Sequence, residues 1–152
     1  MPRTRPRAAR RPRIRTAVFP GQYDSLGDIV DFVTAAAEEA GFEARDVQAV
    51  QLAVDEACSN IIEHAYGGER RGDIECRCCI DGDALITTLT DQGAPFDLDA
   101  VPEPDLEAAL EERAEGGLGV FIIRRLMDEI HYVFTPGIGN VLTLIKRRGK
   151  SA

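Results

Sequence analysis

The chain has 152 residues, about the length of one ordinary domain, and 44 % of them are hydrophobic, which suits a globular core and argues against disorder. It contains no run of eighteen apolar residues, and no apolar segment follows its basic start. We therefore expect neither a membrane span nor a secretion signal, and we place the protein in the cytoplasm. The net charge of −8 disfavours nucleic acid as a direct partner.

The charge is distributed unevenly along the chain. Residues 1–15 carry seven arginines and no acidic side chain, and Pro2, Pro6 and Pro12 stand among them. Such a segment has little apolar surface to bury, so residues 1–13 are predicted to form a disordered basic arm before a domain spanning residues 14–150. The alternative role of the arm is contact with nucleic acid or another acidic surface. Residues 16–152 carry 11 basic and 26 acidic side chains, a balance that suits a protein partner with a basic surface.

The first half of the domain reads as a strand, two helices and a hairpin. A strand is predicted over residues 14–20, followed by a helix over 25–40 that Ser25 caps and Gly41 ends. Asp46 is predicted to cap a second helix that ends near residue 66, before Gly67 and Gly68. Strands over 73–80 and 84–91 then form a hairpin around the turn at residues 81–83.

The second half begins with a long polar connection over residues 92–117, in which residues 103–115 have the composition of a short acidic helix. A connection of this length inside a compact domain is usually functional, so we expect a mobile lid. A helix over 118–127 and strands over 129–134 and 141–147 complete the chain. The element order predicts an α/β fold, a two-layer α/β sandwich with helices on one face of a mixed, mostly antiparallel sheet.

The four cysteines are Cys58, Cys76, Cys78 and Cys79, and their spacing matches no zinc pattern. Strand alternation places Cys76 and Cys78 on one face together with isoleucines. We interpret them as small core residues. The alternative is a metal or redox role.

The second predicted helix carries the first candidate site. Its core stripe is Val47, Val50, Val54, Ala57 and Ile61, and at about 100° per residue Glu56 and Asn60 lie one turn apart on a flank of that stripe. The amide oxygen of Asn60 can bind Mg²⁺, and the Glu56 carboxylate can accept a proton from an attacking hydroxyl. The alternative is a solvated polar flank. A metal site that also includes His64 is conceivable, but for His64 we favour a structural hydrogen bond at the helix end.

Two further motifs have a chemical interpretation. Asp91 shares its parity with Leu85 and Leu89, so its carboxylate faces the core and needs a donor such as the amino group of adenine. Gly93 would let a flat ligand approach the backbone, although a turn-capping aspartate is the alternative. Residues 116–119, Gly-Gly-Leu-Gly, lead directly into an apolar helix, whose free N–H groups can bind phosphate. The alternative is a flexible hinge.

In order and combination these motifs resemble the GHKL ATPases, which have the Bergerat fold. Glu56-x-x-x-Asn60 looks like their N box, Asp91-x-Gly93 like their G1 box and Gly117-x-Gly119 like their G2 box. The longer strings, Glu56-Ala-Cys-Ser-Asn60-Ile-Ile-Glu-His64-Ala-Tyr66 and Gly116-Gly-Leu-Gly119, are most similar to the anti-sigma-factor serine kinases. The resemblance covers about residues 14–147. It departs at Pro95, where many members of the superfamily have glycine.

The resemblance implies an ATP-dependent serine/threonine kinase that uses Mg²⁺. Glu56 would be the catalytic base and Asn60 the metal ligand. It also implies a homodimer whose partners are an alternative sigma factor and a phosphorylated anti-anti-sigma protein of the STAS fold. The alternatives are an ATP-binding anti-sigma module without kinase activity and a simple ATPase. The residues expected to bind the nucleotide are Asn60, Asp91, Gly93, Gly117, Leu118, Gly119 and Thr143.

Overall fold

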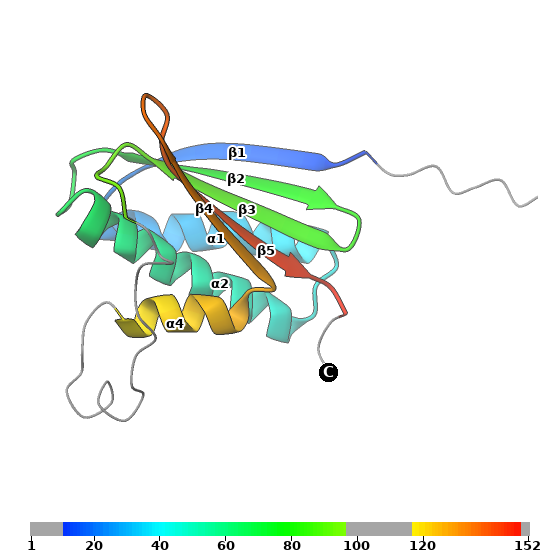
Figure 1. Cartoon of the computed structure of the whole chain (residues 1–152). Coiled ribbons are helices and arrows are strands. Elements are labelled where there is room, and N and C mark those ends of the chain that lie inside the picture. The colour runs from blue at the N-terminus through cyan, green and yellow to red at the C-terminus, as the bar shows by residue number, and fades with distance from the viewer. Residues whose placement is uncertain (1–10, 97–116, 150–152) are drawn as a thin grey trace, which may run out of the picture.

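The computed structural model describes residues 11–96 and 117–149 (Figure 1). The predicted basic arm up to residue 10, the acidic helix over 103–115 and most of the predicted lid fall outside the described residues. Residue 13 already belongs to the first strand.

A five-stranded sheet forms one layer, and three helices cover one of its faces (Figure 1). This confirms the two-layer α/β sandwich. All four strand pairings are antiparallel in the described residues, whereas the sequence predicts a mixed sheet. The difference arises because β5 lies between β3 and β4 and runs opposite to both. The strands, in the order β1-β2-β3-β5-β4, are Arg13–Pro20, Asp73–Asp81, Ala84–Asp91, Gly139–Arg147 and Glu129–Thr135.

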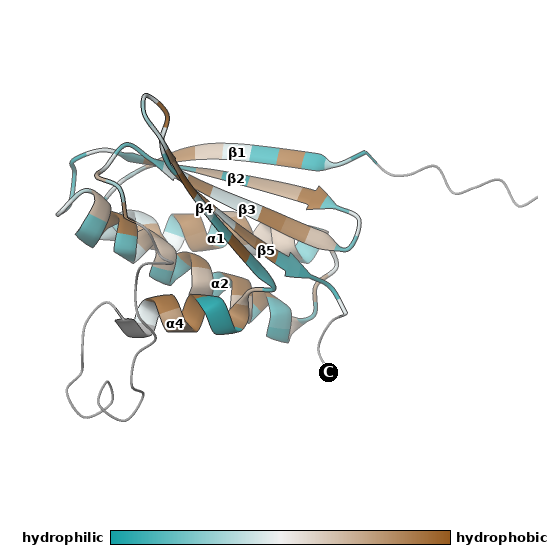
Figure 2. Cartoon of the chain, in the orientation of Figure 1, coloured by the Kyte–Doolittle hydropathy of each residue, from teal (hydrophilic) through white to brown (hydrophobic). Residues whose placement is uncertain are grey.

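The helices α1 (Leu26–Glu39), α2 (Ala44–Asn60) and α4 (Gly117–Leu126) bury their apolar faces against the sheet. In Figure 2 most of α4 has the colour of hydrophobic residues, and its last turn, with Arg124 and Arg125, is hydrophilic. The predicted apolar stripe of α2 is buried along its whole length. Burial of these side chains against β2, β3 and β5 is the main favourable term for this layer.

Alternation along β2 determines which of its cysteines face the helices. Cys76 and Cys78 are buried together with Ile74 and Ile80, which confirms that they are small core residues. All four cysteines are free thiols, and burial raises the pKa of Cys58 well above its ordinary value. The buried, protonated thiol of Cys58 is therefore unreactive.

The two predicted helix caps differ in outcome. Ser25 stands at the N-cap position of α1, as predicted, although it is buried at the end of a 3₁₀ turn over Tyr23–Ser25 and its side chain makes no capping hydrogen bond. The predicted cap at Asp46 is wrong. The second helix begins two residues earlier than Asp46, which instead lies in the first turn of α2. There its negative charge faces the positive end of the helix dipole, so the residue favours the helix start without capping it.

The end of α2 contains a feature that the sequence does not predict. Residues Ile61–Ala65 form a single π turn, in which Tyr66 N–H donates to the carbonyl of Ile61 at 2.9 Å. The chain then leaves the helix at Gly67, as predicted, with a positive φ of 71°. Such turns are rare and frequently lie at functional sites. Here the turn follows directly after Asn60.

Within residues 11–96 and 117–149, no helix or strand covers the face of the sheet away from the helices, which we call the uncovered face (Figure 1). Ile14 and Val18 on β1 and Val133 on β4 are each more than half exposed on it. Among residues 11–96 and 117–149, none of the helices has the length and apolar character needed to cross a membrane.

Candidate functional site

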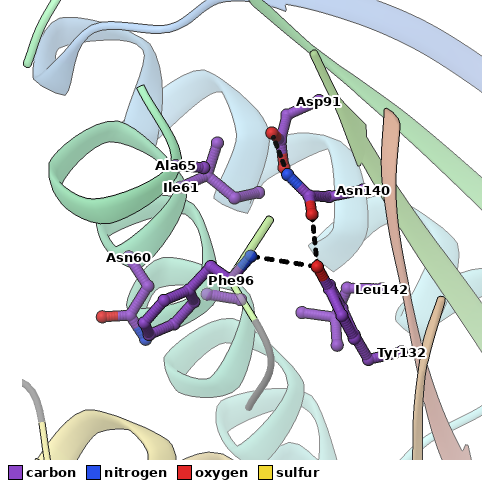
Figure 3. A pocket seen from close by; sticks show the side chains of 9 residues that line it. Asn60, Ile61, Ala65, Asp91, Phe96, Tyr132, Asn140 and Leu142 are labelled. Carbon is purple, nitrogen blue, oxygen red and sulfur yellow. Dashed lines mark hydrogen bonds between the residues drawn. The ribbon is translucent and has the colours of Figure 1, made fainter. Parts of the chain in front are cut away.

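A pocket lies between the end of α2, the end of β3 and the paired strands β4 and β5 (Figure 3). Its wall contains two of the predicted site residues, Asn60 and Asp91, from elements far apart in the sequence. The full lining is Ala57, Asn60, Ile61, Ala65, Asp91, Phe96, Tyr132, Asn140 and Leu142.

Asp91 is the buried carboxylate of this pocket, with only 2 % of its surface exposed. Its Oδ1 accepts the N–H of Gly93 at 2.8 Å and the amide of Asn140 at 2.9 Å. Burial raises the pKa of Asp91, and these two hydrogen bonds oppose that rise because they favour the charged form. Both bonds end on Oδ1, and no described residue donates to Oδ2.

Gly93 is required for a close approach within the protein. A Cβ added at this position would lie 2.5 Å from both the carbonyl carbon and the carbonyl oxygen of Ala65. The next residue, Ala94, donates its N–H to that same oxygen at 2.8 Å. The turn after β3 is thereby fixed to the π turn of α2. This packing gives Gly93 a structural role in addition to the approach of a flat ligand that the sequence predicts.

We expect Gly93→Ala to lower the free energy of unfolding by about 1–3 kcal/mol, because the added methyl forces the two backbones apart. Urea unfolding measures the change. Gly27→Ala is the matched control, since a Cβ at Gly27 in α1 meets no atom within 4 Å and should not destabilise the protein. Equal stability of the two variants would contradict the packing role.

The predicted N box and G2 box meet at the start of α4. A Cβ on Gly119 would lie 2.7 Å from Oε2 of Glu56 and 3.8 Å from Nδ2 of Asn60. The first turn of α4 therefore lies directly against the side chains on the flank of α2. Gly117 and Leu118 open the same helix. The N-terminal end of α4, where free N–H groups can bind an anion, is therefore beside Glu56 and Asn60.

Glu56 and Asn60 differ in their electrostatic surroundings. The pKa of Glu56 is raised, chiefly by desolvation and then by the negative charges of Asp55 and Glu63. Asn60 is buried, and its Nδ2 has no hydrogen-bond partner among the residues that the structure describes. A buried amide without a partner is costly unless a ligand or ion supplies contacts, so the site is incomplete as it stands.

Sequence reasoning missed three residues of the pocket, namely Phe96, Tyr132 and Asn140. Asn140 was placed in the turn between the last two strands, whereas β5 begins at Gly139 and Asn140 pairs with Asp91 on β3. The available signal was its parity, because Asn140 alternates in step with the buried Leu142 and Leu144.

The same alternation separates Thr143 from the pocket. Its neighbours Leu142 and Leu144 face the helices, so Thr143 lies on the uncovered face of the sheet, paired with Thr88 and His131. The structure does not bring Thr143 together with the other predicted nucleotide-binding residues, and we leave it out of the site.

His64 stacks on Phe96, with ring centroids 5.0 Å apart and an interplanar angle of 15°. The described part of the chain holds no cluster of three or more His, Cys, Asp or Glu arranged for a metal ion. His64 therefore packs against an aromatic ring that lines the pocket, and its Nε2 lies 3.9 Å from Oε2 of Glu63, beyond hydrogen-bond distance.

Comparison with known proteins gives a consistent result. The family model described as a histidine kinase-like ATPase domain matches residues 19–146. The serine-protein kinase RsbW of Bacillus velezensis is 30 % identical over 130 residues, which cover 82 % of this chain and 81 % of the relative. RsbW of Listeria monocytogenes serovar 1/2a is 33 % identical over 126 residues, covering 80 % and 79 %.

These matches extend over nearly all of the described residues and include every motif that meets around the pocket. The chain therefore belongs to the GHKL superfamily, through its histidine kinase-like ATPase domain, and to the anti-sigma-factor serine kinase family within it.

Proposed function

We propose that the protein is an ATP-dependent serine/threonine kinase of the cytoplasm that acts as an anti-sigma factor and phosphorylates a STAS-type anti-anti-sigma partner. The observation that carries the proposal is the contact at the start of α4. There Gly119 lies against the Glu56 carboxylate, with Asn60 beside it. A candidate base, a candidate metal ligand and a candidate phosphate site are thus next to one another.

The nucleotide would lie with its base in the pocket and its phosphates at the start of α4. Oδ2 of Asp91 is free to accept a hydrogen bond from the amino group of adenine. The N–H groups of the first turn of α4 are suited to phosphate, because they have no partners within the helix and point along its dipole. Gly117, Leu118 and Gly119 supply this turn.

The residues present fit a magnesium ion. Asn60 is buried with one amide nitrogen unpaired, and rotation of that amide would turn its oxygen toward an ion at the phosphates. When bound, Mg²⁺ would neutralise charge on the phosphate oxygens. The family name of the relatives implies ATP use, and the magnesium ion is our own addition to the proposal.

Glu56 would act on the acceptor hydroxyl. Its oxygen accepts the proton of the partner's serine or threonine as that hydroxyl oxygen bonds to the γ-phosphorus, and the bond to the leaving ADP breaks. Burial and two neighbouring carboxylates raise the pKa of Glu56, which makes it a stronger base than an ordinary glutamate. It remains ionised, and so able to accept a proton, above that raised pKa.

Transfer of labelled phosphate from ATP to a STAS protein encoded beside this gene tests the proposal. Phosphoserine or phosphothreonine on the partner supports the kinase. If ATP binds and a sigma factor is held without any transfer, the protein is a binding module. Release of phosphate to water without a protein acceptor would identify a simple ATPase.

The proposal includes a homodimer. The uncovered face of the sheet carries Ile14, Val18 and Val133, all more than half exposed, on the side opposite to the helices and the pocket. A second copy could pack on this face without obstructing the nucleotide site.

We expect Asp91→Asn to weaken ATP binding by about 1–3 kcal/mol, because an acceptor facing the adenine amino group is partly replaced by a donor. Titration calorimetry measures the affinity, and the unfolding midpoint without ligand serves as the control for folding. If the variant binds ATP as tightly as the wild type, Asp91 is only a turn residue.

A further inference from the structure

Asn140 is the most highly connected polar side chain of the pocket, and it is almost fully buried. It stands directly opposite Asp91 in the pairing of β3 with β5. Its Nδ2 donates to Oδ1 of Asp91 at 2.9 Å, to the carbonyl of Ala94 at 2.9 Å and, more weakly, to the carbonyl of Gly93 at 3.3 Å.

These neighbours fix the orientation of the amide. All three groups around Nδ2 are acceptors, so the NH₂ end must point toward them and the carbonyl end away. The carbonyl Oδ1 accepts a hydrogen bond from the hydroxyl of Tyr132, which in turn accepts the N–H of Phe96 at 3.0 Å (Figure 3). A flipped amide would set its oxygen against the Asp91 carboxylate.

The consequence for Asp91 concerns its ionisation. Asn140 and the N–H of Gly93 are its hydrogen-bond donors among the described residues, and no basic side chain there forms an ion pair with it. The titratable groups that also face it are the Cys58 thiol and the Tyr66 hydroxyl, and neither contributes positive charge. The two donors therefore lower the pKa of Asp91, whereas burial raises it and favours the protonated acid.

An ionised carboxylate can only accept, whereas a protonated one can also donate. We propose that Asn140 is a positioning residue that sets nucleobase selectivity. By donating to Asp91, it keeps that carboxylate an acceptor, so the pocket takes a purine with a 6-amino group and rejects one with a 6-oxo group. This inference rests on the proposed nucleotide site.

The test compares ATP with inosine triphosphate, whose base carries a 6-oxo group where adenine has a 6-amino group. Affinities are measured by calorimetry between about pH 5.5 and 8 for the wild type and Asn140→Leu. Leucine has a similar volume and no donor. We expect the wild-type preference for ATP to change less across this range than that of the variant, because Asn140 and the N–H of Gly93 both donate to the Asp91 carboxylate and favour its charged form.

In Asn140→Leu the loss of a donor to the charged form raises the pKa of Asp91 further. Protonation then grows as the pH falls, and ATP affinity should fall with it, by about tenfold at the lowest pH. Inosine triphosphate should be affected less or bind better, since its 6-oxo group can accept from the protonated acid. The ratio of the two affinities therefore falls with pH in the variant.

Two controls separate this role from a purely structural one. Asn140→Ser keeps a hydroxyl that can donate to Asp91 and loses the bonds to the carbonyls of Gly93 and Ala94, so it should retain the wild-type preference. Tyr132→Phe removes the donor to Asn140 without changing the donors to Asp91, so it should weaken both nucleotides alike. Circular dichroism establishes that each variant is folded.

Equal weakening of both nucleotides at every pH in the leucine variant would overturn the inference and leave Asn140 as a structural residue. If Asn140→Leu does not fold, a serine variant that loses the preference for ATP overturns it, and one that keeps the preference at reduced affinity supports it. Wild-type protein that binds neither nucleotide would overturn the proposed function itself. The outcomes above overturn only the role of Asn140, so the two failures are distinguishable.

Discussion

Replacing Glu56 by glutamine is expected to lower phosphoryl transfer to the partner by about 10²–10⁴-fold while ATP affinity stays close to the wild-type value. Glutamine keeps the size of the side chain beside Gly119 and cannot accept the proton of the attacking hydroxyl. Base and phosphate contacts are assigned to Asp91 and the start of α4, so binding does not depend on Glu56. Labelled transfer and calorimetry, carried out in parallel, measure the two effects.

The pH dependence of transfer is a second test of Glu56 as the base. A base is active in its ionised form, so the wild-type rate should fall as the pH drops through the raised pKa of Glu56. Glu63→Gln is the matched control, because removing a nearby negative charge lowers that pKa and should move the fall to lower pH. Transfer by Glu56→Gln at the wild-type rate would show that another group is the base.

Asn60→Ala is expected to reduce magnesium-dependent nucleotide binding and transfer together, each by roughly 10²–10³-fold, because the ion that neutralises the phosphates loses its protein ligand. Nucleotide affinity measured with Mg²⁺ and again with EDTA gives the part of the affinity that depends on the metal ion. The wild type should lose affinity on chelation, and the variant should change little.

Asn60→Asp is the control for this substitution, since it retains an oxygen ligand at the same position and should recover much of the magnesium-dependent binding. If Asn60→Ala responds to chelation as strongly as the wild type, the ion is held elsewhere. Glu56→Gln and Asn60→Ala thus separate the two roles. Loss of the base lowers the rate of transfer alone, whereas loss of the metal ligand lowers both the rate and the nucleotide affinity.

The parts of the site that depend on local periodicity could be predicted from the sequence. The apolar stripe of α2 places Glu56 and Asn60 one turn apart, and the parity of Asp91 turns its carboxylate toward the core. The glycines before α4 predict a helix start that can approach an anion. Each of these inferences needs only the spacing of residues within one element.

What the sequence could not provide was contact between elements. The π turn after Asn60 and the resulting approach of Gly93 to Ala65 depend on how α2 meets the end of β3. Asn140 was treated as a turn residue because the start of β5 was placed two residues too late. Thr143 lies away from the other predicted site residues because it alternates out of step with the buried Leu142 and Leu144.

The one-sided covering of the sheet has a consequence for how such a protein can diversify. Every residue assigned to chemistry or nucleotide binding lies on the helical side of the sheet, whereas Ile14, Val18 and Val133 lie on the other. Substitutions of these three residues change no side chain that lines the pocket. Surface recognition on this face and the proposed nucleotide site are therefore genetically separable within a single small domain.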